Sequence, residues 1–157
     1  MTRDHQPLYW EDFPEGHSAF LGTKTVTREE IVAFAAEFDP QPFHLDESAA
    51  RDTMLGGLAA SGWHTCAMLM RMMCEGYLLD AMSLGSPGLD EVRWMKPVRA
   101  GDTLSAKYTI RDARPSGSRP FVGICRVFYE VSNQHGDMVM TWDCTQFFSR
   151  RPEGRAS

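Results

Sequence analysis

The sequence lacks any apolar run long enough to cross a lipid bilayer. No stretch of the 157 residues approaches the roughly 20 consecutive apolar residues that a membrane-spanning helix needs. Residues 1–7 also lack the apolar core of a signal peptide. The sequence therefore predicts a cytoplasmic protein that has no membrane partner.

Paired cysteines are also missing. The four cysteines stand singly within apolar stretches, with no CxxC pair and no spacing typical of a metal finger. Isolated cysteines in such surroundings are more often reduced core residues than metal ligands or disulfide partners. We therefore expect neither a disulfide nor a metal site from these residues: Cys66, Cys74, Cys125 and Cys144.

The chain has no overall excess of positive charge. Its formal net charge is −5, which argues against nucleic acid as a partner. Basic residues nevertheless gather over 93–126, where eight Lys and Arg residues stand against two Asp residues. Such a segment either keeps strands solvated or forms a local site for a phosphorylated small molecule.

What remains is an ordinary globular composition. Hydrophobic residues make up 43% of the chain and charged residues 24%. The length is typical of one domain. We expect a single domain over 1–157, with an irregular lead-in over 1–16 and a flexible tail over 150–157.

Turn signals separate a strand and several helices in the first half of the chain. Thr27 and Glu30 have the spacing of a capping box. In the residues that follow them, apolar side chains recur with the helical period. Pro40 and Pro42 disfavour helix for the residues that precede them. These patterns predict a strand over 17–26, a helix that begins after Thr27 and stops at Asp39, a short helix over 46–50 and a long helix over 62–79.

The long helix is apolar around nearly its whole circumference, which is typical of a buried helix. After this helix along the chain, β-branched and aromatic residues alternate with polar ones in four segments separated by turn signals. We expect these segments to be strands in antiparallel succession: 89–98, 103–113, 121–132 and 138–148. Four long strands and one apolar helix predict an α+β fold in which a curved antiparallel sheet wraps around the central helix.

A carboxylate and an imidazole lie close together after the first helix. Asp39 and His44 are five positions apart, in a segment stiffened by Pro40 and Pro42. Such a pair can hold one water molecule, because the carboxylate accepts a proton and the imidazole accepts or donates one. Taken alone, each residue more often has a structural role, as a turn residue or a packed side chain.

The start of the long helix is a second candidate site. The first N–H groups of a helix have no internal partner and carry partial positive charge. The N–H of Gly62 can therefore stabilise a negatively charged oxygen. The glycine itself either lets a ligand approach or eases close packing at the helix start.

In combination, these motifs resemble the MaoC-like dehydratases and (R)-specific enoyl-CoA hydratases. Residues 39–44, Asp-Pro-Gln-Pro-Phe-His, are similar to the hydratase-2 motif of that family, usually Asp-x-Asn-Pro-x-His, with Gln41 in place of the asparagine. Residues 61–63 fall where the family has His-Gly or Ser-Gly. Residues 92–102 resemble its following strand, with an aromatic residue, then Pro-Val and Gly-Asp. The resemblance covers roughly residues 17–149.

The resemblance implies a hotdog fold and a homodimer or dimer of dimers whose active site lies at the subunit interface. It implies an acyl-CoA or acyl-carrier-protein thioester as the partner molecule, and no metal or redox cofactor. The expected reaction adds water to a trans-2-enoyl-CoA to give (R)-3-hydroxyacyl-CoA, or the reverse. The family's catalytic pair maps onto Asp39 and His44, and the glycine that binds the thioester carbonyl maps onto Gly62.

Substrate contacts are expected from residues near this pair, near the helix start and in the basic segment: Ser61, Trp63, Gln41 and Arg93. The phosphates of CoA would give the basic segment 93–126 a role. Two other functions stay open, a hotdog thioesterase and a non-catalytic acyl-thioester-binding protein in which the pair is structural. The Asp39–His44 spacing favours hydration.

Overall fold

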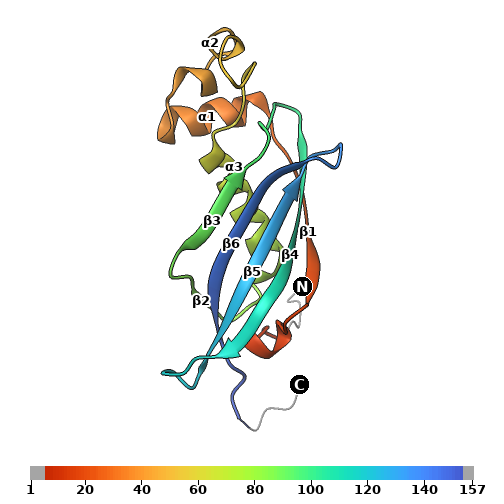
Figure 1. Ribbon diagram of the computed structural model, residues 1–157, viewed down its shortest axis with the longest axis vertical. Helices are drawn as coiled ribbons and strands as arrows, with labels where there is room; N and C mark the ends of the chain where they lie inside the picture. Colours follow the sequence, from red (N-terminus) through yellow and green to blue (C-terminus); the bar gives the residue numbers. More distant parts are fainter. Residues whose placement is uncertain (1–5, 154–157) are drawn as a thin grey trace.

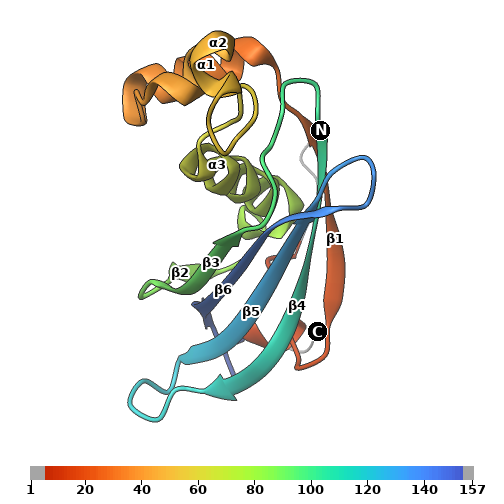
Figure 2. The same ribbon diagram turned by 45° about the horizontal axis from the view of Figure 1, so that its top comes forward.

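The computed structural model describes residues 6–153 and shows helices packed on one face of an antiparallel sheet (Figure 1). The helix α3 (Gly62–Met73) lies along the concave face of the curved sheet, while α1 (Arg28–Phe38) and α2 (Glu47–Arg51) lie at one end of the molecule (Figure 2). The strands are β1 (Ser18–Thr25), β2 (Ser83–Gly85), β3 (Leu89–Trp94), β4 (Thr103–Pro115), β5 (Val122–Ser132) and β6 (Met138–Ser149).

The sheet confirms the predicted succession of its last three strands and corrects the place of β3. Its order is β1-β4-β5-β6, and β2 and β3 both pair with β6. The strands β4, β5 and β6 are antiparallel neighbours, as expected for consecutive strands joined by short turns. The expectation that β3 would precede β4 in this succession is wrong, because β3 pairs with β6 instead. Strand character is local, whereas the partner of β3 depends on which sheet edge is free.

The first helix begins and ends as the sequence predicts. The Thr27 hydroxyl accepts a hydrogen bond from the Glu30 N–H at 3.1 Å, which caps α1. The carboxylate of Glu30 pairs with Lys24. Ile31 and Ala35 bury the apolar side of the helix, and Asp39 takes the C-cap position. The local sequence thereby places Asp39 at the point where the chain leaves α1.

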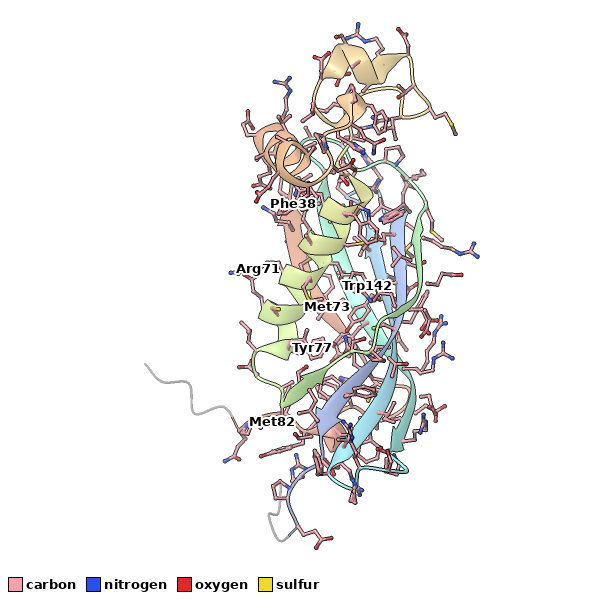
Figure 3. The ribbon with its side chains drawn as sticks, turned by 90° about the vertical axis from the view of Figure 1, so that its left-hand side faces the viewer. Phe38, Arg71, Met73, Tyr77, Met82 and Trp142 are labelled. Atoms are coloured by element: carbon pink, nitrogen blue, oxygen red, sulfur yellow. The ribbon has the colours of Figure 1, made fainter. Side chains whose placement is uncertain are left out.

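The long helix has an exposed face as well as a buried one. After Met73 the chain continues as a π-helical turn, Cys74–Leu78, so the predicted extent to residue 79 is close. Figure 3 shows Met73 and Tyr77 between the helix and the sheet, and Arg71 directed away from the sheet. The expectation of a helix buried all round is wrong, because Trp63 is 58% exposed and Met70 is 40% exposed.

The core lies between α3 and the concave face of the sheet. Alternate residues of β4, β5 and β6 are buried there, as the period of a strand requires. Within the described part of the chain, all four cysteines are free, and Cys66, Cys125 and Cys144 are buried. Three of the four therefore pack in the core as the sequence predicts, whereas Cys74 is only half-buried.

The part of the predicted lead-in that the structure describes, 6–16, packs against the end of the sheet. It contains a short 3-10 turn, Trp10–Asp12, and Phe13 is buried with its ring stacked on Phe148 at 4.5 Å between centroids. Residues 1–5 of the predicted lead-in and 154–157 of the predicted tail lie outside the described residues. The helices over 6–153 include none that is long and apolar enough to span a membrane.

Candidate active site

Asp39 and His44 come together as the sequence predicts. After α1, Pro42–His44 forms a 3-10 turn that brings the imidazole back towards the end of the helix. The distance from Asp39 Oδ2 to His44 Nε2 is 3.4 Å. This exceeds the roughly 2.7–2.9 Å of a direct charge-assisted hydrogen bond. The two groups therefore lie close enough to contact one water molecule without being locked to each other.

The orientation of the His44 ring is set by a backbone carbonyl. His44 Nδ1 lies 2.7 Å from the carbonyl oxygen of Ala59. A carbonyl oxygen can only accept, so Nδ1 carries the hydrogen and Nε2 of the neutral imidazole keeps its lone pair. The side chain of His44 is only 9% exposed. The atom directed at Asp39 is thus a proton acceptor in the neutral ring.

The carboxylate of Asp39 accepts one hydrogen bond on each oxygen. Ser61 Oγ donates to Oδ2 at 2.7 Å, and Gln41 Nε2 donates to Oδ1 at 2.7 Å. Partial burial alone would raise the pKa of Asp39. The two hydrogen bonds and the nearby His44 together outweigh burial and hold the pKa of Asp39 below its usual range. Asp39 is therefore ionised at neutral pH.

The start of α3 faces the same region. Ser61 is the N-cap residue, and its hydroxyl accepts from the Trp63 N–H at 3.3 Å while donating to Asp39. Gly62 occupies the first helical position, where the N–H has no partner within the helix. In the part of the chain that the structure describes, this N–H has no other acceptor either. It is available to an oxygen in the cavity.

Gly62 is a glycine because a tryptophan lies against it. A Cβ atom at position 62 would come within 2.5 Å of the Trp94 ring, closer than real contacts allow. The Trp94 indole N–H also donates to the Gly62 carbonyl oxygen at 3.0 Å. The sequence left two reasons for this glycine, ligand approach and close packing at the helix start. The contact with Trp94 supports close packing.

These groups surround a cavity of about 300 Å³. This volume is at the lower end of the range for ligand pockets, about 300–1,000 Å³. Asp39, His44 and Gly62 contribute the polar groups. Apart from Ser61, Thr65 and Lys96, the remaining wall is apolar or aromatic. It comes from the loop before α3, the first turn of α3, the end of β3 and the segment after β3: Leu55, Ala60, Ser61, Trp63, Thr65, Trp94, Met95, Lys96, Pro97 and Val98.

The predicted substrate-contact residues divide into two groups. Ser61 and Trp63 line the cavity, and Gln41 binds Asp39 without lining it. Arg93 does not line the cavity, because its side chain is exposed and pairs with Glu91 at 2.9 Å. Across the described residues, no group of three His, Cys, Asp or Glu side chains is arranged to hold a metal ion.

Most of the basic segment lies away from the cavity. Arg111 and Arg126 approach Asp143, and the Arg111 guanidinium also lies 3.6 Å from the centre of the Phe128 ring. Lys96 is the member of the segment that lines the cavity, and it pairs with Asp137 at 3.0 Å. Solvation of strands therefore accounts for Arg111 and Arg126, and Lys96 is left as the candidate for contact with a phosphate.

Two contributors to the site carry no clear signal in the sequence. The carbonyl of Ala59 orients His44, yet a backbone oxygen has no sequence signature. Trp94 covers Gly62, although the sequence indicates only an aromatic residue in a strand. The aromatic residue before Pro-Val in 92–102 could have marked Trp94 as a wall residue, but not its hydrogen bond to α3.

Removing either donor to Asp39 should raise the pKa of this carboxyl group. In Ser61→Ala and Gln41→Ala, burial still favours the neutral acid while one opposing hydrogen bond is lost. Because the pKa of Asp39 is lowered in the folded protein, its ionisation stabilises the fold above the unfolded pKa. This stabilisation disappears as the pH falls through the folded pKa. As the pH is lowered, both variants should lose the stabilisation from ionised Asp39 at a higher pH than the wild type does.

Titration of the Asp39 carboxyl carbon by NMR measures this shift directly. Gln41→Ala is the cleaner variant, since the Gln41 side chain caps no helix, whereas Ser61→Ala also removes the cap of α3 and about 0.5–2 kcal/mol of stability. An unchanged Asp39 pKa in both variants would contradict the assignment of these two hydrogen bonds as the cause of the low pKa.

The chain matches a known protein family over most of its length. Residues 13–123 match the model of the MaoC like domain. The chain is 30% identical over 114 residues to a protein from Rhodospirillum rubrum named (R)-specific enoyl-CoA hydratase, covering 68% of this chain and 72% of the relative.

Solved structures agree with this match. The crystal structure of the MaoC-like dehydratase from Rhodospirillum rubrum superposes with a TM-score of 0.83 at 40% identity, covering 92% of this chain and 99% of that one. A Mycobacterium tuberculosis protein described as a double hotdog fold superposes with a TM-score of 0.75 at 15% identity, covering 96% of this chain and 47% of that one. The hotdog fold, an antiparallel sheet with a helix packed against it, is thus confirmed.

Proposed function

Because this chain belongs to the MaoC-like dehydratase family, we propose that it adds water to a trans-2-enoyl thioester to give the (R)-3-hydroxyacyl thioester, or catalyses the reverse. The observation that carries the proposal is the joint placement of three groups around one cavity. The Asp39 carboxylate and the His44 imidazole, 3.4 Å apart, share that cavity with the N–H of Gly62, which has no acceptor among the described residues. We assign the whole chain to one catalytic domain.

In the hydration direction, Asp39 and His44 hold the attacking water. The carboxylate of Asp39 accepts a hydrogen bond from the water, and its low pKa keeps it charged for this task. The Nε2 lone pair of His44 removes the water proton as the oxygen bonds to the β-carbon. The Ala59 carbonyl strengthens this step, because it accepts from Nδ1–H and stabilises the imidazolium that forms.

The Gly62 N–H then stabilises the charge that reaches the thioester oxygen. As the new C–O bond forms, the electrons of the double bond move towards the carbonyl and generate an enolate. A helix N-terminal N–H directed at that oxygen favours the enolate over the ground state. Return of the proton from the His44 imidazolium to the α-carbon completes the addition, so every atom of water ends in the product.

Two features of the chain support a thioester as the substrate. The wall of the cavity beside the polar groups is apolar and aromatic, which suits an acyl chain. Lys96 provides a positive charge at the same cavity, where CoA or the phosphopantetheine arm of an acyl carrier protein would present phosphate. The ion pair between Lys96 and Asp137 would have to break for Lys96 to bind that phosphate.

The direct test is incubation of the purified protein with crotonyl-CoA and a series of longer and aromatic enoyl-CoAs. Hydration removes the absorbance of the conjugated enoyl group and releases no free thiol. Release of thiol would instead identify a thioesterase. Binding without turnover of any member of the series would identify an acyl-thioester-binding protein, and either result would overturn the proposal.

We further propose that the active unit is a homodimer or a dimer of dimers. Large apolar side chains are exposed around the mouth of the cavity, where Trp63 is 58%, Trp94 47% and Met95 51% exposed. The adjacent strand β3 has mostly exposed residues and pairs only with β6 among the described strands. Exposed apolar surface beside an open strand edge is typical of an interface.

Light scattering should therefore give at least twice the 17.7 kDa mass of the chain at micromolar concentration. An obligate interface of this kind buries on the order of 2,000 Å² or more. Trp63→Glu should weaken the assembly by placing a charge in the apolar patch. Arg71→Glu, on the outward side of the same helix, serves as a matched control. A monomeric mass for the wild type would refute the expectation.

A further inference from the structure

We propose that Arg99 is a positioning residue for His44, holding the backbone loop whose carbonyl fixes the tautomer of the imidazole. The inference rests on the proposed function only for its catalytic consequence. The loop runs from the end of α2 to Ser61, the cap of α3, and ends in the buried residues 58–61. Arg99 lies beyond β3, more than forty residues further along the chain.

One guanidinium binds three carbonyls of this loop. Nη1 donates to the carbonyl oxygen of Gly57 at 2.7 Å and of Leu58 at 3.2 Å, and Nη2 donates to that of Leu55. Gly57 and Leu58 are buried and Leu55 is half-buried. Because buried carbonyls without partners are costly, a side chain that binds all three carbonyls determines the course of the chain there. The backbone of Arg99 is itself held, since its N–H donates to Asp102 Oδ2 at 2.8 Å.

The same loop is held from the side of α2. Glu47 Oε2 accepts from the Leu58 N–H at 2.9 Å. A Cβ at Gly57 would lie 3.1 Å from Glu47 Oε1 and 3.3 Å from Arg99 Nη1, so both side chains close tightly on this glycine. Leu58 thus has its N–H bound by Glu47 and its carbonyl bound by Arg99.

The residue that follows Leu58 is the one that orients His44. Ala59 presents its carbonyl oxygen to His44 Nδ1 at 2.7 Å. On the far side, the Ala60 N–H donates to the Val98 carbonyl at 2.9 Å, and Val98 directly precedes Arg99. The Ala59 carbonyl therefore lies between two fixed points, the Leu58 carbonyl bound by Arg99 and the Ala60 N–H bound to Val98.

Arginine suits this task for a geometric reason. Its planar guanidinium carries five N–H donors in a rigid fork. The ammonium of lysine is instead a compact point charge at the end of a flexible stem. Lysine at position 99 would keep the charge and much of the stem, but it could not satisfy the three carbonyls together. Loss of the fork should let the loop move and weaken the Nδ1–H···O contact.

The consequence for catalysis is a change in the tautomer of His44. With the Ala59 carbonyl in place, the neutral ring carries its hydrogen on Nδ1 and offers Nε2 to the water. Without that anchor, the Nε2–H tautomer becomes populated, and this form cannot accept the water proton. A displacement of about 1 Å in such a group can cost on the order of 10²-fold in rate.

The experiment compares Arg99→Lys and Arg99→Ala with Arg111→Lys as the matched control on the outer face of the sheet. Nitrogen-15 NMR of the His44 ring reads the tautomer without reference to activity. We expect the wild type and Arg111→Lys to show the Nδ1–H form. Arg99→Lys should show a mixture of the two tautomers, with kcat reduced roughly 10–100-fold and KM changed much less.

Millimolar guanidinium, far below denaturing concentration, should restore the Nδ1–H tautomer and the kcat of Arg99→Ala by filling the vacated site.

A folded Arg99→Lys protein that keeps the Nδ1–H form and the wild-type kcat would overturn the inference. The inference would also fail if Arg99→Ala did not fold while Arg99→Lys behaved as the wild type, since Arg99 would then serve stability alone. Absence of hydration by the wild type would count against the proposed function. The NMR comparison would still decide whether Arg99 positions His44.

Discussion

Asp39→Asn should reduce kcat/KM for hydration roughly 10²–10⁴-fold, the scale of general acid–base catalysis, because His44 can deprotonate the water only while Asp39 holds it in place. Asparagine keeps the shape of the side chain but cannot carry the negative charge that holds the water. The Ser61 hydroxyl can rotate to accept from the new amide, so the local hydrogen bonding can be largely retained. Folding should therefore be nearly unaffected, because the group lies at a partly open cavity and not in the core.

His44→Ala should give a comparable loss, and the double variant should be little worse than either single one. Groups that act together on one water function as a unit, so their effects do not add. Melting temperature and kcat/KM are to be measured on the same samples. If the pair were only structural, activity would fall in proportion to the folded fraction. A well-folded Asp39→Asn protein with the wild-type rate would end the proposed mechanism.

The second large effect is expected at Gly62, where one substitution removes a single N–H. Gly62→Pro deletes the donor proposed to bind the enolate oxygen, and it does so at the first helical position, which tolerates proline well. Ser61 already has φ −54° and ψ 142°, a conformation compatible with a following proline. The helix should therefore form as before while kcat falls roughly 10²–10³-fold.

The close contact with Trp94 requires a matched design for this experiment. Either substitution places a Cβ against the Trp94 ring, so both are made in a Trp94→Ala background that removes the clash. Gly62→Ala/Trp94→Ala keeps the N–H, and Gly62→Pro/Trp94→Ala lacks it. The ratio of their kcat values isolates the N–H itself. Equal rates in the two double variants would show that Gly62 binds no developing charge.

Much of the local structure follows from neighbouring residues. Thr27 caps α1 because its hydroxyl reaches an N–H three residues away, and the prolines at 40 and 42 end the helix at Asp39. The return of the chain over Pro42–His44 is equally local, so the five-residue spacing is enough to predict that Asp39 and His44 meet. The buried alternation of β4, β5 and β6 follows from the two-residue period of a strand.

The partner of β3, the exposed face of α3 and the orientation of the basic side chains could not be predicted from the sequence, because they depend on how the elements pack together. The pairing of β3 with β6 was decided by a free strand edge, and the exposed face of α3 by how one helix sits on a curved sheet. Arg93, predicted from its charge, pairs with Glu91 outside the cavity, whereas Lys96, three residues later, lines it.

Contacts within a few residues are enough to predict the helices, nearly all of the strands and the proximity of the catalytic candidates Asp39 and His44. The tertiary structure alone decided that Trp94 lies against Gly62 and that the Ala59 carbonyl sets the His44 ring. It also decided that Arg99 holds the loop carrying that carbonyl. The physical reason is that backbone N–H and C=O groups are the same at every non-proline position, so only folding selects which of them meet a side chain.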